Sequence, residues 1–73
     1  MFQLWEAESA NLVGSYPTEE AALLVVRAAI ERHGRETLDS LVLLREEVRG
    51  QIIPVAEGAA LADLALTRTS PAA

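Results

Sequence analysis

The sequence predicts a two-layer α+β domain in the order ββαββα, with a four-stranded antiparallel sheet, one long helix and one short helix. Three observations support this: two pairs of short extended segments, a well-delimited helical segment between them, and an apolar segment at helical spacing near the end. Of the 73 residues, 51% are hydrophobic, which suits one folded core, and the chain is too short for a second domain. We expect one domain over residues 1–67 and a frayed tail over residues 68–73.

The first hairpin is predicted at the start of the chain. Residues Phe2–Glu6 alternate between two sides, with Trp5 opposite Leu4, and their aromatic content favours a strand. A polar turn and a second extended segment, Leu12–Tyr16, follow before Pro17 ends the pattern. Together these segments predict two antiparallel strands.

The long helix has the best-marked ends. Thr18 is the predicted N-cap, because its hydroxyl can accept a hydrogen bond from a free backbone N–H of the first turn. The helix should run from Glu19 to His33 and end at Gly34, which can adopt the left-handed conformation common after helices.

On a helical wheel, Glu20, Arg27 and Glu31 form a narrow polar stripe on this helix. We expect the opposite side to pack on the sheet, and its residues are Ala22, Val25, Val26 and Ala29. Leu23 and Leu24 flank the polar stripe, so the apolar arc is wider than one packed surface requires. We therefore predict that a partner covers these two leucines.

A second hairpin and a short helix are predicted after a polar link. Residues 41–44 are a short apolar strand, residues 46–50 are a turn candidate, and residues 51–56 form the fourth strand. Pro54 has no N–H to donate, so this strand is expected at an edge of the sheet. Residues 59–67 carry leucines and alanines at helical spacing and predict the second helix.

Both faces of the predicted sheet are apolar. Leu41 and Leu43 project to one side and Val42 and Leu44 to the other. A bare second face would forgo burial worth about 25 cal/mol per Å² and leave a patch larger than most monomers tolerate. We therefore predict a homo-oligomer, most simply a dimer, or a subunit of a larger assembly. The interface residues are predicted to be Trp5, Leu23, Leu24, Val42, Leu44, Ile53 and Val55. The alternative is that the second helix covers this face within the same chain.

The charge of the chain argues against nucleic acid as a partner. Six basic and eleven acidic side chains give a net charge of −5, so the phosphate neutralisation that drives nucleic-acid affinity is lacking overall. Residues 1–20 carry four glutamates and no base. An ordinary solvated surface explains this excess of acidic residues. The alternative is that the acidic hairpin docks on a basic protein partner.

No residue pattern points to catalysis, a cofactor or a metal. His33 is the only histidine and cysteine is absent, so one chain offers neither a two-histidine nor a thiolate metal site. The serines lack a nucleophile-elbow glycine pattern, and the glutamate pairs have the character of solvated surface acids. We therefore expect a non-enzymatic protein without a cofactor.

The sequence also bears on location. The longest apolar run, residues 21–26, is far shorter than the about 20 residues that cross a bilayer. The start of the chain lacks the charged and apolar regions of a secretory signal. A cytoplasmic bacterial protein without membrane contact is expected.

Several stretches resemble a set of short bacterial proteins of hairpin–helix–hairpin type with no assigned function. They are Leu4-Trp5-Glu6, Glu8-Ser9-x-Asn11-Leu12-Val13-Gly14-x-Tyr16, Thr18-Glu19-Glu20-Ala21, Val26-Arg27 and Glu31-Arg32-His33-Gly34. The likeness covers about residues 2–58 and implies the order hairpin, helix, hairpin, without supplying functional residues.

Two further resemblances carry functional implications. The strand leading into Tyr16-x-Thr18-x-x-Ala21 is similar to the hairpin-to-helix joint of integrase arm-binding domains, which contact DNA through their strands; the first hairpin here has no Lys or Arg to meet phosphate. The chain also resembles Hic-type antitoxins, small proteins with strands packed on a helix that neutralise basic RNA-cutting toxins. That likeness implies an antitoxin-like inhibitor as the alternative function.

Overall fold

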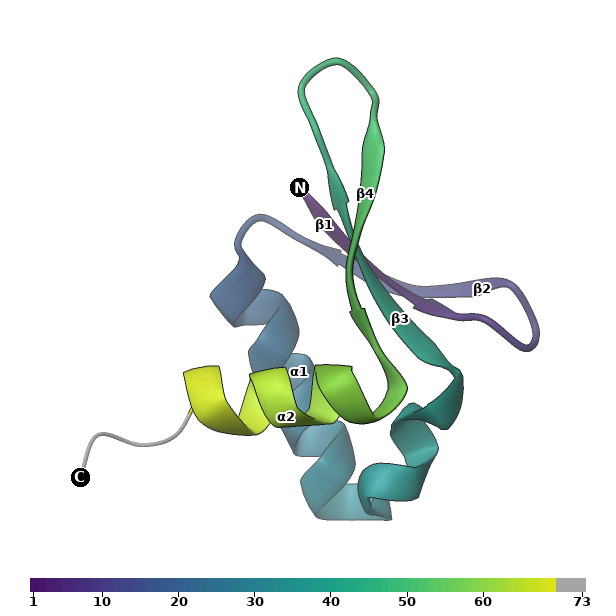
Figure 1. Ribbon diagram of the computed structural model, residues 1–73, viewed down its shortest axis with the longest axis vertical. Coiled ribbons are helices and arrows are strands. Elements are labelled where there is room, and N and C mark those ends of the chain that lie inside the picture. Colours follow the sequence, from purple (N-terminus) through teal and green to yellow (C-terminus); the bar gives the residue numbers. More distant parts are fainter. Residues whose placement is uncertain (70–73) are drawn as a thin grey trace.

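The computed structural model describes residues 1–69 and contains one four-stranded sheet with helices on one side (Figure 1). Its elements are β1 (Phe2–Glu6), β2 (Asn11–Tyr16), α1 (Glu19–His33), the 3₁₀ helix η1 (Arg35–Ser40), β3 (Leu41–Glu46), β4 (Ile52–Glu57) and α2 (Gly58–Arg68). The predicted α+β class and the ββαββα order are confirmed, with η1 as an addition in the predicted polar link.

The sheet joins the two hairpins through their inner strands. Its order is β2-β1-β3-β4 and every neighbouring pair is antiparallel. β4 therefore lies at an edge, as Pro54 predicts. The turn of the β3–β4 hairpin projects away from both helices (Figure 1).

The register fixes which side chains share a face. Leu4 lies opposite Leu43 and Trp5 opposite Val42 across the β1–β3 ladder. Because side chains alternate along a strand, Leu4 and Leu43 point to one side and Trp5 and Val42 to the other. Leu4 and Leu43 are almost fully buried, so theirs is the side that the helices cover.

A β-bulge in the β3–β4 ladder makes the side chains of β4 face differently from the prediction. Leu43 lies opposite Ala56 but Leu44 lies opposite Pro54, which leaves Val55 as the extra residue. Val55 packs against the core, and Ile53 lies opposite Arg45. The prediction that Ile53 and Val55 share a face with Val42 and Leu44 was therefore wrong.

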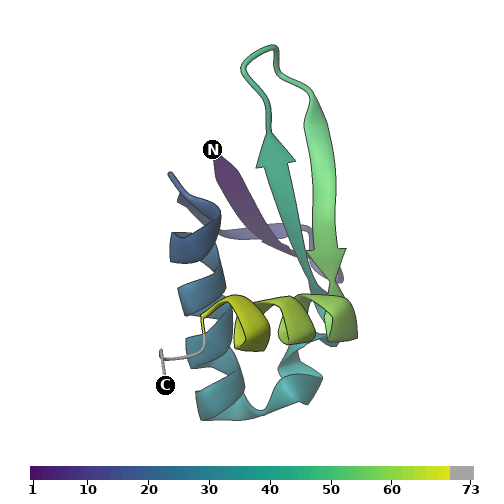
Figure 2. The same cartoon turned by 60° about the vertical axis from the view of Figure 1, so that its left-hand side comes forward.

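The core lies between the sheet and the helices. Its largest fully buried side chains are Leu4, Leu23, Val26, Leu38, Leu43 and Leu61. Ala22 of α1 and Ala62 and Ala65 of α2 are also fully buried, and such small side chains allow the two helices to approach closely. α2 therefore packs on the same side of the sheet as α1 (Figure 2), and the alternative that it covers the opposite face is wrong.

The ends of α1 match the prediction. The Thr18 hydroxyl oxygen accepts a hydrogen bond from the backbone N–H of Ala21 at 3.1 Å. At the other end, the N–H of Gly34 donates to the carbonyl of Ile30 at 2.7 Å. Gly34 has φ 86° and ψ 167°, so its φ is positive but its ψ lies outside the predicted left-handed helical region.

The buried side of α1 differs from the prediction. Leu23 is fully buried, whereas Val25 is 36% exposed. The polar stripe lies only partly on the solvent side: Glu20 and Glu31 are exposed, but Arg27 is half-buried and donates from Nη1 to the carbonyl of Thr69, at the end of α2. The helix is consequently turned so that Leu23 points into the core.

α2 extends one residue past its predicted end. Arg68 belongs to the helix and its Nη1 lies 2.9 Å from Oε1 of Glu19 on α1, and the N–H of Thr69 donates to the carbonyl of Ala65. The predicted tail thus included two ordered residues, and its remainder, residues 70–73, lies outside the described residues. Within residues 1–69, neither helix combines the length and apolar character needed to cross a membrane, and the cytoplasmic location stays a prediction.

Candidate functional site

The side of the sheet turned away from the helices carries a continuous apolar centre. Val42 and Leu44 of β3 lie on it, and Trp5 of β1 lies beside Val42. The ladders place Leu12 of β2 next to Trp5, and Pro54 of β4 next to Leu44. We call this surface the outer face and define it by Trp5, Leu12, Val42, Leu44, Ile52 and Pro54.

The exposure of these side chains follows from their places in the sheet. Trp5, Val42 and Leu44 are half-buried because neighbouring strands shield their flanks. Leu12 and Ile52, on the two outer strands, are 48% and 47% exposed. Since both helices lie on the other side, no element among residues 1–69 covers the apolar centre (Figure 2). Apolar surface of this kind is typical of protein-binding sites.

A short chain of hydrogen bonds orients the indole of Trp5. Its Nε1–H donates to Oε1 of Gln3 at 3.0 Å, and Nε2 of Gln3 donates to Oε1 of Glu46 at 3.3 Å. The polar edge of the indole is thus satisfied within the chain. Its apolar body is left to form part of the outer face, the arrangement expected of an aromatic contact residue.

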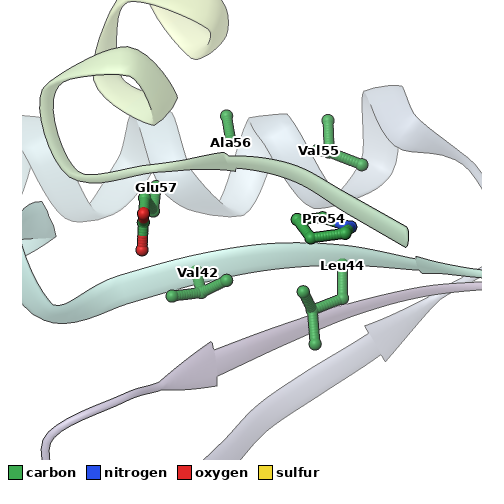
Figure 3. Close-up of a pocket in the computed structure, with 6 residues that line it drawn as sticks. All are labelled: Val42, Leu44, Pro54, Val55, Ala56 and Glu57. Atoms are coloured by element: carbon green, nitrogen blue, oxygen red, sulfur yellow. The ribbon is translucent and has the colours of Figure 1, made fainter. Parts of the chain in front are cut away.

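A hollow lies along the β4 edge of the outer face (Figure 3). Its volume is about 270 Å³, and its lining residues are Val42, Leu44, Pro54, Val55, Ala56 and Glu57. Val42 and Leu44 point to the side opposite Val55 and Ala56, so the hollow wraps around the edge strand (Figure 3). It is smaller than the about 300–1,000 Å³ typical of small-molecule sites, and only Glu57 brings an ionisable group to it.

The two charged side chains that the β3–β4 ladder places on the outer face are both acidic. Glu46 lies beside Ile52 at one end of the β3–β4 ladder, and Glu57 lies beside Val42 at the other. The nearest arginine in sequence, Arg45, pairs with Phe2 and so points to the helix side. The apolar centre is therefore bordered by two carboxylates.

The structure brings together only part of the predicted interface. Trp5, Val42 and Leu44 share the outer face, whereas Val55 packs toward the core and Ile53 is 36% exposed on the helix side of the β3–β4 hairpin. Leu24, 50% exposed, lies on α1, well separated from these residues. The prediction that Leu23 is available to a partner was wrong, because Leu23 is 1% exposed.

Sequence reasoning missed Leu12, Ile52 and Pro54 as members of the outer face. Their positions depend on register shifts, one between Leu4 and Trp5 and one between Leu43 and Leu44. Gly14 and Pro54 are the residues in the sequence that could have marked these irregularities, because each lies at the partner position beside a register shift. The prediction relied instead on the alternation within each strand, and the bulges break that alternation.

The outer face offers a mainly apolar contact surface. Within residues 1–69, no group of three His, Cys, Asp or Glu side chains is placed to hold a metal ion. In the same part of the chain, every buried side-chain nitrogen or oxygen has a hydrogen-bond partner. No protein-family model matches this chain, and neither a curated protein nor a solved structure does.

Proposed function

We propose that this chain is a non-enzymatic, self-associating protein-interaction module, and that the outer face is where two copies meet. The observation that carries the proposal is the apolar centre of Trp5, Val42 and Leu44 on a sheet face that neither helix covers. A rigid aromatic side chain at the middle of such a surface is a common interface anchor.

The size of the outer face supports a reversible dimer. Four strands spaced about 4.8 Å apart and about 18 Å long present a face of roughly 19 by 18 Å. Two such faces packed together would remove about 700 Å² from solvent, less than the about 1,200–2,000 Å² of stable interfaces and in keeping with a weak, reversible one. The mass in solution should therefore depend on concentration, with monomers when dilute and dimers when concentrated.

The test is sedimentation equilibrium over about two orders of magnitude in protein concentration. The wild-type chain should pass from monomer to a larger species. Leu44→Glu places a charge in the apolar centre and should abolish the part of this association that uses the outer face, which lowers the mass at a given concentration. A wild-type mass equal to one chain at every concentration overturns the proposal.

Two further variants make this test specific. Val48→Glu is the matched control, because Val48 is fully exposed at the turn of the β3–β4 hairpin and lies outside the outer face. It should associate like the wild type. Leu12→Glu, at the rim of the outer face, provides a second disruption at a half-exposed site that a charge can occupy without unfolding the sheet. Circular dichroism of each variant reports whether it is folded.

A second candidate function is inhibition of a basic partner, in the manner of an antitoxin. The specific observation in its favour is that Glu46 and Glu57 border the apolar centre, whereas Arg45, the nearest arginine in sequence, points to the helix side. A partner with arginines around an apolar patch would complement this pattern better than a second acidic face. A synthetic peptide of alternating arginine and leucine is a suitable probe, and its affinity should fall in Glu57→Gln and with added salt. Binding that salt and Glu57→Gln leave unchanged would remove this candidate.

A further inference from the structure

α1 carries apolar side chains on the side that faces away from the core. Leu24 is 50% exposed and Val25 is 36% exposed. Ala21 lies about one turn before them and Ala28 about one turn after them. Positions 21, 24, 25 and 28 have the i, i+3, i+4, i+7 spacing of a single helix face. We call these four residues the α1 stripe.

The α1 stripe lies where a solvent-facing helix is normally polar. The opposite side of α1 holds Ala22, Leu23 and Val26, which are fully buried in the core. A helix that is apolar on both sides usually has neighbours on both sides. Within residues 1–69, neighbours are present on one side only.

Each end of the α1 stripe carries one charge that lacks an ion-pair partner in the described part of the chain, and the two charges are opposite in sign; Glu31, which is also near the second end, is paired with Arg27. Glu20 lies four residues before Leu24, and Arg32 lies four residues after Ala28, so each is in line with the stripe. Both side chains are exposed, and neither takes part in an ion pair among residues 1–69. They are twelve residues apart, about 18 Å along the helix axis, so they cannot pair within one helix.

We propose that the α1 stripe is an interface with the same helix of a second copy, packed antiparallel about a two-fold axis. In this arrangement Glu20 of each copy lies next to Arg32 of the other, which gives two reciprocal ion pairs at the ends of the interface. The same alignment places Leu24 of each copy against the small side chain of Ala28 of the other copy. A parallel arrangement would place like charges opposite each other.

This interface goes beyond the proposed function, because it lies on the helix side of the molecule and the outer face lies on the other (Figure 2). Two self-complementary surfaces on opposite sides would allow assembly past a dimer. The two interfaces can be tested separately, since the residues of the outer face and of the α1 stripe do not overlap.

Charge reversal provides the test, carried out by sedimentation in a Leu44→Glu chain to silence the outer face. Glu20→Arg and Arg32→Glu should each weaken the remaining association about tenfold or more, because each sets like charges opposite each other twice per dimer. Combining the two changes should restore it to about the parental value. Glu8→Arg, the same change of charge on the exposed β1–β2 turn, is the matched control and should have no such effect.

Recovery of association in the double variant distinguishes a contact between two copies from an effect of the substitutions on folding. Glu20→Arg and Arg32→Glu each oppose the helix dipole, so in the double variant their effects on thermal stability should add. Association, in contrast, should recover. An association that falls further in the double variant, or does not change in the single variants, overturns the proposal.

A disulfide provides a second measurement. The chain contains no cysteine, so Val25→Cys introduces a unique thiol near the proposed two-fold axis. Mild oxidation should link two such chains, whereas Val13→Cys, 50% exposed on β2, should remain largely unlinked. Equal yields for the two variants would contradict the antiparallel packing. If the Leu44→Glu chain has the same mass as the wild type at every concentration, the proposed function fails. The charge-reversal and disulfide variants would still test the α1 stripe.

Discussion

The indole N–H of Trp5 donates to the side-chain oxygen of Gln3, two residues earlier on the same strand and the same face, at 3.0 Å. The bond fixes the polar edge of the only tryptophan of the chain, whose side chain lies on the outer face. Trp5 is therefore a built-in reporter for whatever covers that face.

Tryptophan fluorescence should follow self-association. As protein concentration rises, a second copy should exclude water from Trp5, and the emission maximum should move to shorter wavelength. The Leu44→Glu chain, in which contact through the outer face is blocked, should emit at the same wavelength at every concentration. An identical concentration dependence in both chains would mean that the change at Trp5 does not arise from contact at the outer face.

Truncation of a core side chain should destabilise the fold strongly. Leu43 is fully buried between β1 and the helices, so Leu43→Ala should lower the free energy of unfolding by about 2–5 kcal/mol. Val48→Ala removes an apolar side chain of similar size from the fully exposed hairpin turn and should change it by less than about 0.5 kcal/mol. Urea denaturation at low protein concentration measures both. Equal losses would place Leu43 outside the core.

The Thr18 cap should contribute to the stability of α1. Its hydroxyl accepts from the N–H of Ala21 at 3.1 Å, and Thr18→Ala removes this acceptor while leaving the N–H exposed. We expect a loss of about 1 kcal/mol in the free energy of unfolding, and close to none for Thr18→Ser, which keeps a hydroxyl. If serine is as destabilising as alanine, the hydrogen bond is not the cause.

The ends of the elements were more predictable than their faces. Thr18 and Gly34 mark the ends of α1 through backbone chemistry that acts over a few residues, and both were located from the sequence. The rotation of α1 depends instead on the packing of Leu23 in the core, together with a distant contact, the bond from Arg27 to the carbonyl of Thr69. Nothing near Arg27 in the sequence indicates this contact, which is why Leu23 was assigned to the wrong side.

Only part of the candidate site could be predicted from the sequence. Trp5, Val42 and Leu44 were assigned to one surface because β1 and β3 alternate regularly. Val55 and Ile53 were misplaced because the bulge opposite Leu43 and Leu44 shifts the rest of β4 by one residue. The core was also only partly predictable, as Leu38 illustrates. The sequence around Leu38 predicts a polar link, but this segment forms η1 and the Leu38 side chain is fully buried.

Gly34 should tolerate neither alanine nor asparagine. Its φ of 86° and ψ of 167° lie in a region open almost only to glycine, unlike the left-handed helical region that asparagine also occupies. A Cβ at this position would meet no atom within 4 Å, so the cost of a side chain arises from the backbone and not from a clash. Gly34→Ala and Gly34→Asn should each lower the free energy of unfolding by about 1–3 kcal/mol, measured by urea denaturation. If asparagine preserves stability while alanine does not, the residue is in the left-handed helical conformation in solution, and the turn from α1 into η1 differs from the one described.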